Sequence, residues 1–552
     1  MPTLNPDPIA HAHAHAPGGA ARDAEPMNAW VKALLMVLVG VGLFARLAPL
    51  FDGTDRQYAQ FPTEDGYLTL TIARDMADGL GMTTAEGTIP TNGTQPLCTL
   101  MWAAVFWLHG GQGMGAFRSI QLIQILFASL SAWLLYRLGR LVIGASLGAR
   151  RTAAVAAALW FAAPHTIAKT QNCLETGAYT LVAVLFALLL VRQERSQEQG
   201  DRMRIGVAAG LLLGLAFWVR NDAVFLSAGF CGTWLLLDRH GRPGLPFTQP
   251  GSGQALVAGI VALLISLPWL FYNVTRFGSI VPISGQAQTA GNLGTKVTAM
   301  PSTLLELATI ILPGSYSLEL LPHRVEQVSV ALLLALYAWG LYRLRHQIRL
   351  GRRPIAVLTI FMGGLVGYYC MTSFANWHFG RYLFPTSPFF ALASVALLFS
   401  QLDRLRAKAA QVAVIAFLAT TVAIVGYRNL EVYQRATSTT LTHHGFARWV
   451  ERNGLTDEWV GAPESGVLGF YYPRTVNLDG KVNPDAMRAR REGRYADYLL
   501  GSEIAYIVGQ VGFVETELAH DPRIAEAFEW IERDEQLNVA VVRRRSESPI
   551  AR

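Results

Sequence analysis

The sequence predicts an all-α membrane protein, a multi-span bundle of about eleven transmembrane helices followed by a C-terminal extracytoplasmic α/β domain. Of the 552 residues, 52% are hydrophobic and only 15% are charged, whereas a soluble chain carries about 25% charged residues. The apolar residues are gathered into runs close to the roughly 20 residues that a spanning helix needs. Short arginine-rich segments separate these runs, as expected of loops between spans.

The apolar runs divide the chain into three parts. Residues 1–29, rich in Pro, Ala and His, are expected to form a disordered cytoplasmic tail, 30–427 the membrane domain, and 428–552 the soluble domain. We place the spans at 30–50, 116–138, 152–168, 174–191, 205–219, 223–237, 255–272, 326–342, 355–374, 384–401 and 409–427. Two shorter apolar stretches, 96–109 and 302–313, are expected to lie at the outer membrane surface.

The charge distribution predicts the orientation in a bacterial inner membrane. Segments 137–151, 192–204, 238–242, 343–353 and 402–408 together hold eighteen Arg or Lys against five Asp or Glu. The first outer loop, 51–115, is acidic instead, with seven carboxylates and two arginines within residues 51–95. Since cytoplasmic loops carry the excess of positive charge, the N-terminus is expected inside and the C-terminal domain outside. The net charge of +7 therefore reflects topology, and we expect no nucleic-acid partner.

The C-terminal segment changes from long apolar runs to short alternating elements. We expect helices at 443–452 and 484–500, strands at 459–462, 467–471 and 504–508, and a hairpin at 528–544. Strands that alternate with helices are typical of a small α/β domain.

The first outer loop carries an acidic pair at the start of a predicted helix. Thr63 is a good N-cap, and Glu64 and Asp65 suit the positive end of a helix. An apolar stripe at every fourth position predicts that this helix lies on the membrane: Leu68, Ile72, Met76 and Leu80. Adjacent helical residues point about 100° apart, so one carboxylate could act as general base while the other orients a substrate or metal. Simple acidic capping of the helix is the alternative interpretation.

Further polar residues stand where predicted spans meet the outer face. They are Glu175, Arg220, Asn221, Asp222, His378 and Arg381. Since a charge within a bilayer costs about 3 kcal/mol on insertion scales, such side chains tend to face a cavity. Their shared face with the acidic pair predicts a site with acids for an alcohol acceptor and arginines for a phosphate. Interfacial anchors or structural ion pairs are the alternative for each residue alone.

Several short blocks resemble the glycosyltransferase C superfamily, including its arabinofuranosyltransferase-like and protein-mannosyltransferase-like bacterial members. The blocks run in order along the chain: Glu64–Tyr67, Ala73–Gly79, Thr91–Leu97, Leu174–Thr176, Arg220–Asp222, Arg276–Pro282, Phe379–Pro385 and Val476–Gly480. Two departures stand out: the first acid of the pair is Glu64, where Asp is usual, and Asn221 replaces a proline. The position in the family favours Glu64 as the base, while the residues themselves leave the choice between Glu64 and Asp65 open.

The resemblance implies an inverting glycosyltransferase. It would move a sugar from a polyprenyl monophosphate donor to a hydroxyl of a cell-envelope glycan, lipid or protein, with membrane lipid around it. Arg381, assisted by His378 and Arg220, is expected to bind the donor phosphate. The expected substrate-binding residues are Glu175, Asp222, Asn92, Gln95, Tyr471 and Tyr472. No cofactor is required by the pattern, and a divalent cation stays open.

Two other classes of protein compete with this interpretation. A secondary transporter would show internal repeats and broken helices at mid-membrane, which the sequence lacks. A non-catalytic glycan-binding membrane protein of the same fold would have lost the acidic pair, and the pair is present.

Overall fold

The computed structural model describes most of the chain and consists mainly of long helices. The described residues are 27–51, 56–111, 113–144, 148–195, 199–237, 243–245, 251–287, 293–311, 323–372, 379–402, 404–434 and 438–546. Each predicted span falls on helix, with small shifts at its ends. Within the described part, eight helical segments are long and apolar enough to cross a membrane. The expected all-α membrane fold is therefore confirmed, and the chain is a multi-pass membrane protein.

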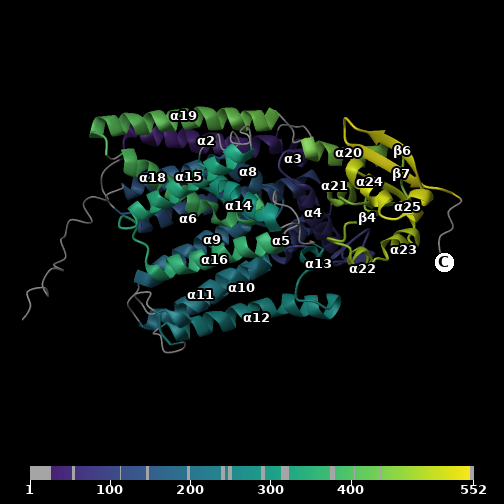
Figure 1. Cartoon of the computed structure of the whole chain (residues 1–552), viewed down its shortest axis with the longest axis horizontal. Coiled ribbons are helices and arrows are strands. Elements are labelled where there is room, and N and C mark those ends of the chain that lie inside the picture. The colour runs from purple at the N-terminus through teal and green to yellow at the C-terminus, as the bar shows by residue number, and fades with distance from the viewer. Residues whose placement is uncertain are drawn as a thin grey trace, which may run out of the picture.

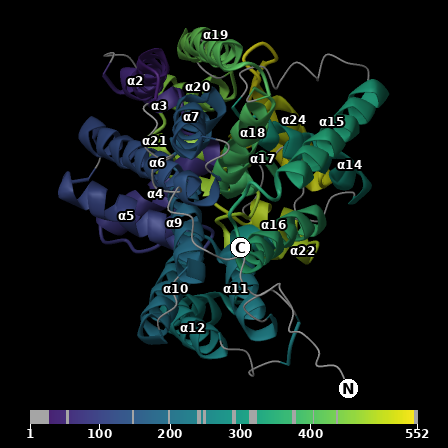
Figure 2. The same ribbon diagram turned by 90° about the vertical axis from the view of Figure 1, so that its left-hand side faces the viewer.

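The long apolar helices run side by side along the longest axis of the molecule (Figure 1). They are α2 (Ala29–Phe51), α6 (Met114–Val142), α9 (Thr176–Arg195), α12 (Ser252–Phe277), α15 (His323–Leu344), α16 (Arg352–Thr372), α18 (Ser387–Leu402) and α19 (Ala407–Gln434). The end-on view shows α2 and α19 together on one side of the bundle, and α12 on the opposite side with α10 (Gln199–Val219) and α11 (Val224–Leu236) (Figure 2).

Shorter helices connect the long ones. They are α3 (Arg56–Ala59), α4 (Glu64–Ala77), α5 (Pro96–Leu108), α7 (Ala149–Ala162), α8 (Pro164–Thr170), η2 (Asn221–Ala223), α13 (Ile283–Gln286), α14 (Leu293–Ala308), α17 (Phe379–Tyr382) and η5 (Phe384–Thr386). The predicted span 152–168 is split between α7 and α8, because Pro164 begins a new helix and cannot continue the old one. A small ribbon of β1 (Thr83–Thr84) and β2 (Ile89–Pro90) follows α4.

The arginine-rich segments meet at one end of the bundle. Ile143 forms a β-bridge with Ile348, and the Gly351 amide donates to the Glu194 carboxylate at 3.0 Å. The Arg353 guanidinium donates to the Leu237 carbonyl at 2.6 Å. Three of the five segments predicted to share the cytoplasmic side, 137–151, 192–204 and 343–353, are thus joined to one another, and Arg353 adds a contact to the end of α11. The C-terminal sheet lies at the opposite end (Figure 1).

The C-terminal part is built on a five-stranded mixed sheet. Its order is β4-β3-β5-β7-β6, with β3 parallel to β4 and β5, and β7 antiparallel to β5 and β6. The strands are β3 (Trp459–Ala462), β4 (Thr475–Asn477), β5 (Ile504–Gly509), β6 (Phe528–Asp534) and β7 (Val539–Arg544). Helices surround it: α20 (Ser438–Arg452), α21 (Gly466–Tyr471), α22 (Pro484–Arg491), α23 (Tyr495–Leu500), α24 (Val511–Ala519) and α25 (Pro522–Ala527).

Two expectations for this part were wrong, and one strand was missed. Residues 467–471 form the helix α21 and not a strand, because an apolar run this short has no decisive period of its own. The predicted helix 484–500 is two helices, since Gly493 between them takes the left-handed φ of 67°. The strand β4 was not anticipated.

The first outer loop folds inward against the rest of the protein. Thr63 caps α4 as expected, accepting a hydrogen bond from the Gly66 amide at 3.2 Å. The helix does not lie on the membrane with one free face, because Tyr67, Leu70 and Ala73 are fully buried along with Ile72 of the predicted stripe. It packs between α5 and α21, so nearly its whole circumference is covered.

Candidate functional site

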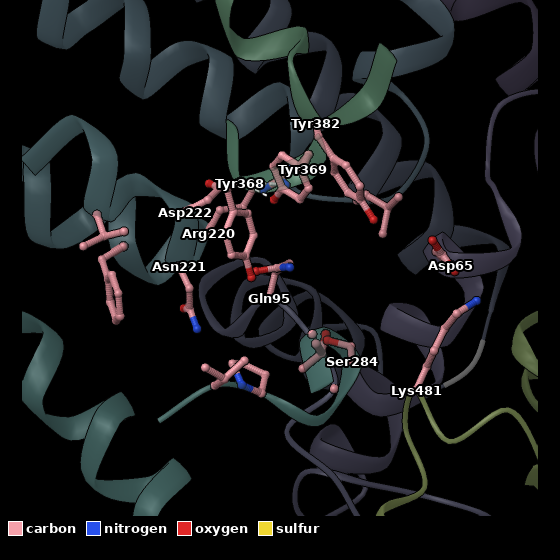
Figure 3. Close-up of a pocket in the computed structure, with 18 of the residues that line it drawn as sticks. Asp65, Gln95, Arg220, Asn221, Asp222, Ser284, Tyr368, Tyr369, Tyr382 and Lys481 are labelled. Carbon is pink, nitrogen blue, oxygen red and sulfur yellow. Dashed lines mark hydrogen bonds and ion pairs between the residues drawn. The ribbon is translucent and has the colours of Figure 1, made fainter. Parts of the chain in front are cut away.

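A cavity of about 490 Å³ lies where the bundle meets the C-terminal sheet region (Figure 3). Its charged and amide lining comes from five distant parts of the chain: Asp65, Gln95, the run Arg220–Asp222, Arg381 and Lys481. Figure 3 shows Asp65 and Lys481 on one side of this cavity and Asn221 and Tyr368 on the other. Apolar side chains line it as well, among them Phe217, Phe225, Leu270 and Val281. The cavity therefore combines charged groups with an apolar wall.

Asp65 is held at the cavity by Arg381. The guanidinium Nη1 of Arg381 lies 2.6 Å from Oδ2 of Asp65, and its Nη2 lies 3.6 Å from Oε1 of Glu175. Burial by itself would lower the pKa of Arg381, but Glu175 and Asp65 raise it above its ordinary value. Arg381 therefore stays positively charged and fixes the direction of the Asp65 carboxylate.

Glu175 connects this pair to a second one. Nη1 of Arg220 lies 3.3 Å from Oε1 of Glu175, and Nη2 of Arg220 lies 2.8 Å from Oδ2 of Asp222. The Tyr369 hydroxyl donates to Oδ2 of Asp222 at 2.5 Å, and the Tyr369 ring stacks on Tyr382 at 4.0 Å. Glu175 is 1% exposed, so it acts as a buried counter-ion between the two arginines and does not line the cavity.

The chain turns at Arg220 in a way that brings this charge to the cavity. Helix α10 ends at Val219, and Arg220 adopts an extended backbone with φ of −156° before η2 begins. Because the helix stops here, Arg220 and Asp222 stand just beyond the end of α10, where both are buried and line the cavity. Their side chains still pair with each other, which lowers the cost of burying two charges.

Glu64 points away from the cavity. Its carboxylate accepts hydrogen bonds from the backbone amides of Gly466 and Val467, the latter at 3.0 Å. Burial raises the pKa of Glu64, whereas His443 and the two amides oppose this rise. The position in the family favoured Glu64 as the base, but the structure brings Asp65 to the cavity and turns Glu64 toward the C-terminal sheet region.

The other predicted site residues divide into lining residues and framework residues. Gln95 lines the cavity. Asn92 does not: its side chain is fully buried, donating to Asn273 Oδ1 and accepting from the Ile283 amide, each at 3.0 Å. It therefore joins the first outer loop to α12 and α13.

Tyr471 and Tyr472 also lie outside the cavity lining. Tyr471 packs against the rings of Tyr67 and His444, with centroid separations of 6.1 and 5.5 Å. The Tyr472 hydroxyl donates to the Glu458 carbonyl at 2.6 Å. Contact between these tyrosines and an acceptor stays a prediction, and such a contact would lie outside this cavity. His378 lies outside the described residues.

Lys481 is the cavity residue that the sequence did not reveal. It follows β4, and its Nζ lies 3.1 Å from Oδ2 of Asp479. The pKa of Lys481 is raised, chiefly by the neighbouring Asp479 carboxylate and also by Asp65, while burial opposes this rise. The block Val476–Gly480 ends one residue before Lys481, so proximity to that block was the available signal. Tyr369 offered none, because it lies within a predicted span.

Among the described residues, no group of three or more His, Cys, Asp or Glu side chains is placed to hold a metal ion. The divalent cation left open by the sequence stays a prediction. Asp65 and Asp222 are the carboxylates of the cavity lining, and both are paired with arginines.

Part of the chain matches a known protein family. Residues 94–272 match the family model described as dolichyl-phosphate-mannose-protein mannosyltransferase. No curated protein matches the chain.

The chain resembles solved membrane glycosyltransferases in fold. ArnT from Cupriavidus metallidurans bound to undecaprenyl phosphate is similar at a TM-score of 0.56 and 14% identity, covering 94% of this chain and 99% of that one. Its apo state gives 0.53 and 14%, with coverage of 93% and 98%. The archaeal oligosaccharyltransferase AglB from Archaeoglobus fulgidus, in complex with an inhibitory peptide and a dolichol-phosphate, gives 0.50 and 12%, with coverage of 95% and 75%. The resemblance to the glycosyltransferase C superfamily is therefore confirmed at the level of the fold, since the chain has the fold of these membrane glycosyltransferases over nearly its whole length.

Proposed function

We propose that this protein is an inverting glycosyltransferase of the bacterial inner membrane. It transfers a sugar from a polyprenyl monophosphate donor to a hydroxyl of a cell-envelope glycan, lipid or protein on the outer face. One observation carries the proposal: the cavity holds a carboxylate fixed by an arginine, Asp65 with Arg381 at 2.6 Å, beside apolar walls at the end of a membrane bundle.

The reaction assigns each charge a task. Asp65 takes the proton from the acceptor hydroxyl while the oxygen of that hydroxyl attacks the anomeric carbon of the sugar. The bond between that carbon and the phosphate oxygen breaks, and the electron pair leaves with the phosphate. Arg381 and Arg220 stabilise the charge that gathers on the leaving phosphate. A single displacement of this kind inverts the anomeric centre.

The apolar part of the cavity suits the lipid of the donor. Phe217 lies in the last turn of α10, Phe225 in the first turn of α11 and Leu270 in α12, so this wall is formed by neighbouring membrane helices. A prenyl chain can stay among such side chains while its phosphate reaches the arginines. The presence of undecaprenyl phosphate in the similar ArnT structure supports this class of donor.

Analysis of the envelope of a deletion strain tests the proposal. We expect one sugar to be missing and the corresponding polyprenyl-phosphate sugar to accumulate, and the wild-type chain to reverse both changes. Asp65→Asn should lower the rate of transfer by a factor of roughly 100 or more relative to the wild-type chain, as is typical of losing a general base. Asp78→Asn, the same change at an exposed position just after α4, is the matched control and should restore it fully.

The same strains separate the rival functions. If the protein were a transporter, the deletion strain would keep the donor on the cytoplasmic side of the membrane. Membranes that are supplied with donor on both sides would then transfer the sugar at the same rate with Asp65→Asn as with the wild type. A non-catalytic glycan-binding protein would leave envelope composition unchanged. Full restoration of the missing sugar by Asp65→Asn would refute the assignment of the base.

A further inference from the structure

Helix α4 holds one helix of the C-terminal sheet region by both of its ends. At the start of α21, the Glu64 carboxylate accepts hydrogen bonds from the Gly466 and Val467 amides. At the end of α21, the Arg74 guanidinium donates to the Phe470 carbonyl at 2.6 Å and to the Gly469 carbonyl at 3.4 Å. An anion at the first turn and a cation at the last turn both match the dipole of a helix.

These contacts replace the partners that the helix lacks within itself. The first amides and the last carbonyls of a helix have no partner in the same helix. In α21, which spans only Gly466–Tyr471, this concerns most of the backbone groups. Glu64 and Arg74 therefore supply much of what stabilises α21, although they lie about 400 residues earlier in the chain.

The two helices also touch closely. A Cβ at Gly466 would collide with the backbone carbonyl of Glu64, so glycine is required for the approach. The Phe470 ring meets the Tyr67 ring edge-on at 5.2 Å, and the Arg74 guanidinium lies 5.4 Å from the Phe470 ring centroid. Burial of this contact makes the position of α21 relative to α4 well determined.

The position of α21 in turn determines where Lys481 stands. Ser465, directly before α21, accepts a hydrogen bond from the Asn477 side chain at 3.0 Å. Asn477 begins the turn that carries Lys481, and its side-chain oxygen accepts from the Gly480 amide at 3.0 Å. The turn meets the first outer loop again at Gly93, where a Cβ would collide with the Lys481 carbonyl.

Lys481 then reaches the same cavity as Asp65 (Figure 3). It supplies a compact cation with three donors to a cavity whose arginines are already engaged with carboxylates. Its own carboxylate neighbour is Asp479 at 3.1 Å. An ammonium on a flexible stem can turn from one oxygen to another, so it can follow a phosphate into the cavity.

We propose that Glu64 is a positioning residue and that Lys481 is a ligand of the donor phosphate. With Arg74, Glu64 holds α21 against α4, and this contact keeps Lys481 at the cavity on the same side as Asp65 (Figure 3). The acidic pair thus has two separate tasks, since Asp65 faces the substrate and Glu64 holds the C-terminal sheet region in place. This inference rests on the proposed function for the identity of the ligand, but the contact between α4 and α21 does not depend on it.

Hydrogen exchange of the full chain in detergent micelles tests the contact without any activity. In Glu64→Gln, the amides of Gly466 and Val467 should exchange about tenfold faster or more, since a charge-assisted acceptor becomes a neutral one. Exchange of β5 (Ile504–Gly509) should stay unchanged and shows that the sheet is folded. Glu503→Gln, the same change at an exposed position, is the control, and Arg74→Lys provides a second way to loosen α21. Unchanged exchange at Gly466 in both loosening variants would overturn the contact.

Binding of undecaprenyl phosphate tests the positioning role. Lys481→Met should weaken binding roughly tenfold, and Glu64→Gln should weaken it in the same direction. If Glu64 acts through Lys481, the double variant should bind no more weakly than Lys481→Met alone. Additive losses, or faster exchange at Gly466 with undiminished binding, would overturn the positioning of Lys481.

The results also distinguish this inference from the proposed function. If Glu64→Gln exchanges faster but deletion of the gene leaves the envelope sugars unchanged, the contact between α4 and α21 is supported and the glycosyltransferase function is refuted. Loss of transfer in Asp65→Asn, together with unchanged exchange and binding in Glu64→Gln, would keep the enzyme and reject the positioning residue.

Discussion

Replacement of Arg381 by lysine removes a bridge while it keeps a positive charge. The guanidinium contacts two carboxylates from separate parts of the chain, Asp65 at 2.6 Å through one nitrogen and Glu175 at 3.6 Å through another. A lysine ammonium is a single nitrogen and cannot span both acceptors in this geometry. The variant therefore loses the orientation of Asp65 or its link to Glu175.

The size of the effect follows from the bond that is lost. A hydrogen bond between charged groups contributes about 1.5–3 kcal/mol. Since 1.36 kcal/mol corresponds to a factor of ten, Arg381→Lys should lower the rate of sugar transfer about tenfold to roughly 150-fold. The side chain of Arg381 is 16% exposed, so screening by water reduces this only modestly. Affinity for undecaprenyl phosphate should fall in the same range if Arg381 also binds the phosphate.

The assay compares Arg381→Lys with Arg276→Lys in the complemented deletion strain. Arg276 lies in the last turn of α12 and is exposed, which is typical of an arginine that anchors a helix end at the membrane surface. Such an anchor tolerates lysine, because either cation can reach the headgroups. Wild-type transfer and wild-type binding in Arg381→Lys would show that Arg381 is an anchor too, and Arg220 would be the next residue to test.

Two further predictions concern topology and close packing. A reporter that is active only in the cytoplasm should be silent when fused after the C-terminal sheet region and active within 343–353, because that segment carries five arginines and no acid; the reverse pattern would overturn the predicted orientation. Gly93→Ala should weaken binding of undecaprenyl phosphate, because the added Cβ meets the Lys481 carbonyl and must displace it, at a cost of about 1–3 kcal/mol. Gly40→Ala, which has open space around it, is the control, and equal binding in both variants would contradict the proposed approach of Lys481.

The fold was largely predictable because the bilayer leaves a plain record in the sequence. Each predicted span falls on helix, since only long apolar runs satisfy both the membrane and the backbone. The cap at Thr63 was also predictable, because it depends on residues three positions apart. The inward folding of α4 was not, since the burial of Tyr67 and Leu70 depends on α5 and α21.

The site was predictable in its parts and not in its arrangement. Sequence reasoning found Asp65, Arg220, Asp222 and Arg381, which the structure gathers at one cavity. It did not find Lys481, because the block Val476–Gly480 ends just before this lysine and its place at the cavity exists only in the folded chain. It also assigned a strand to 467–471, where the partners that stabilise the helix are contributed by Glu64 and Arg74 from far along the chain.

By itself, the sequence determined the membrane class, the order of the helices and the residue types available for chemistry, since these follow from local composition and period. Only the tertiary structure decided which carboxylate of the pair lines the cavity. Glu64 and Asp65 are neighbours with the same charge, and what separates them is the direction each side chain takes from α4. Glu64 meets the unpaired amides of α21, and Asp65 meets the guanidinium of Arg381. Contacts between such distant segments exist only after the chain has folded, so no local pattern could have distinguished the two acids.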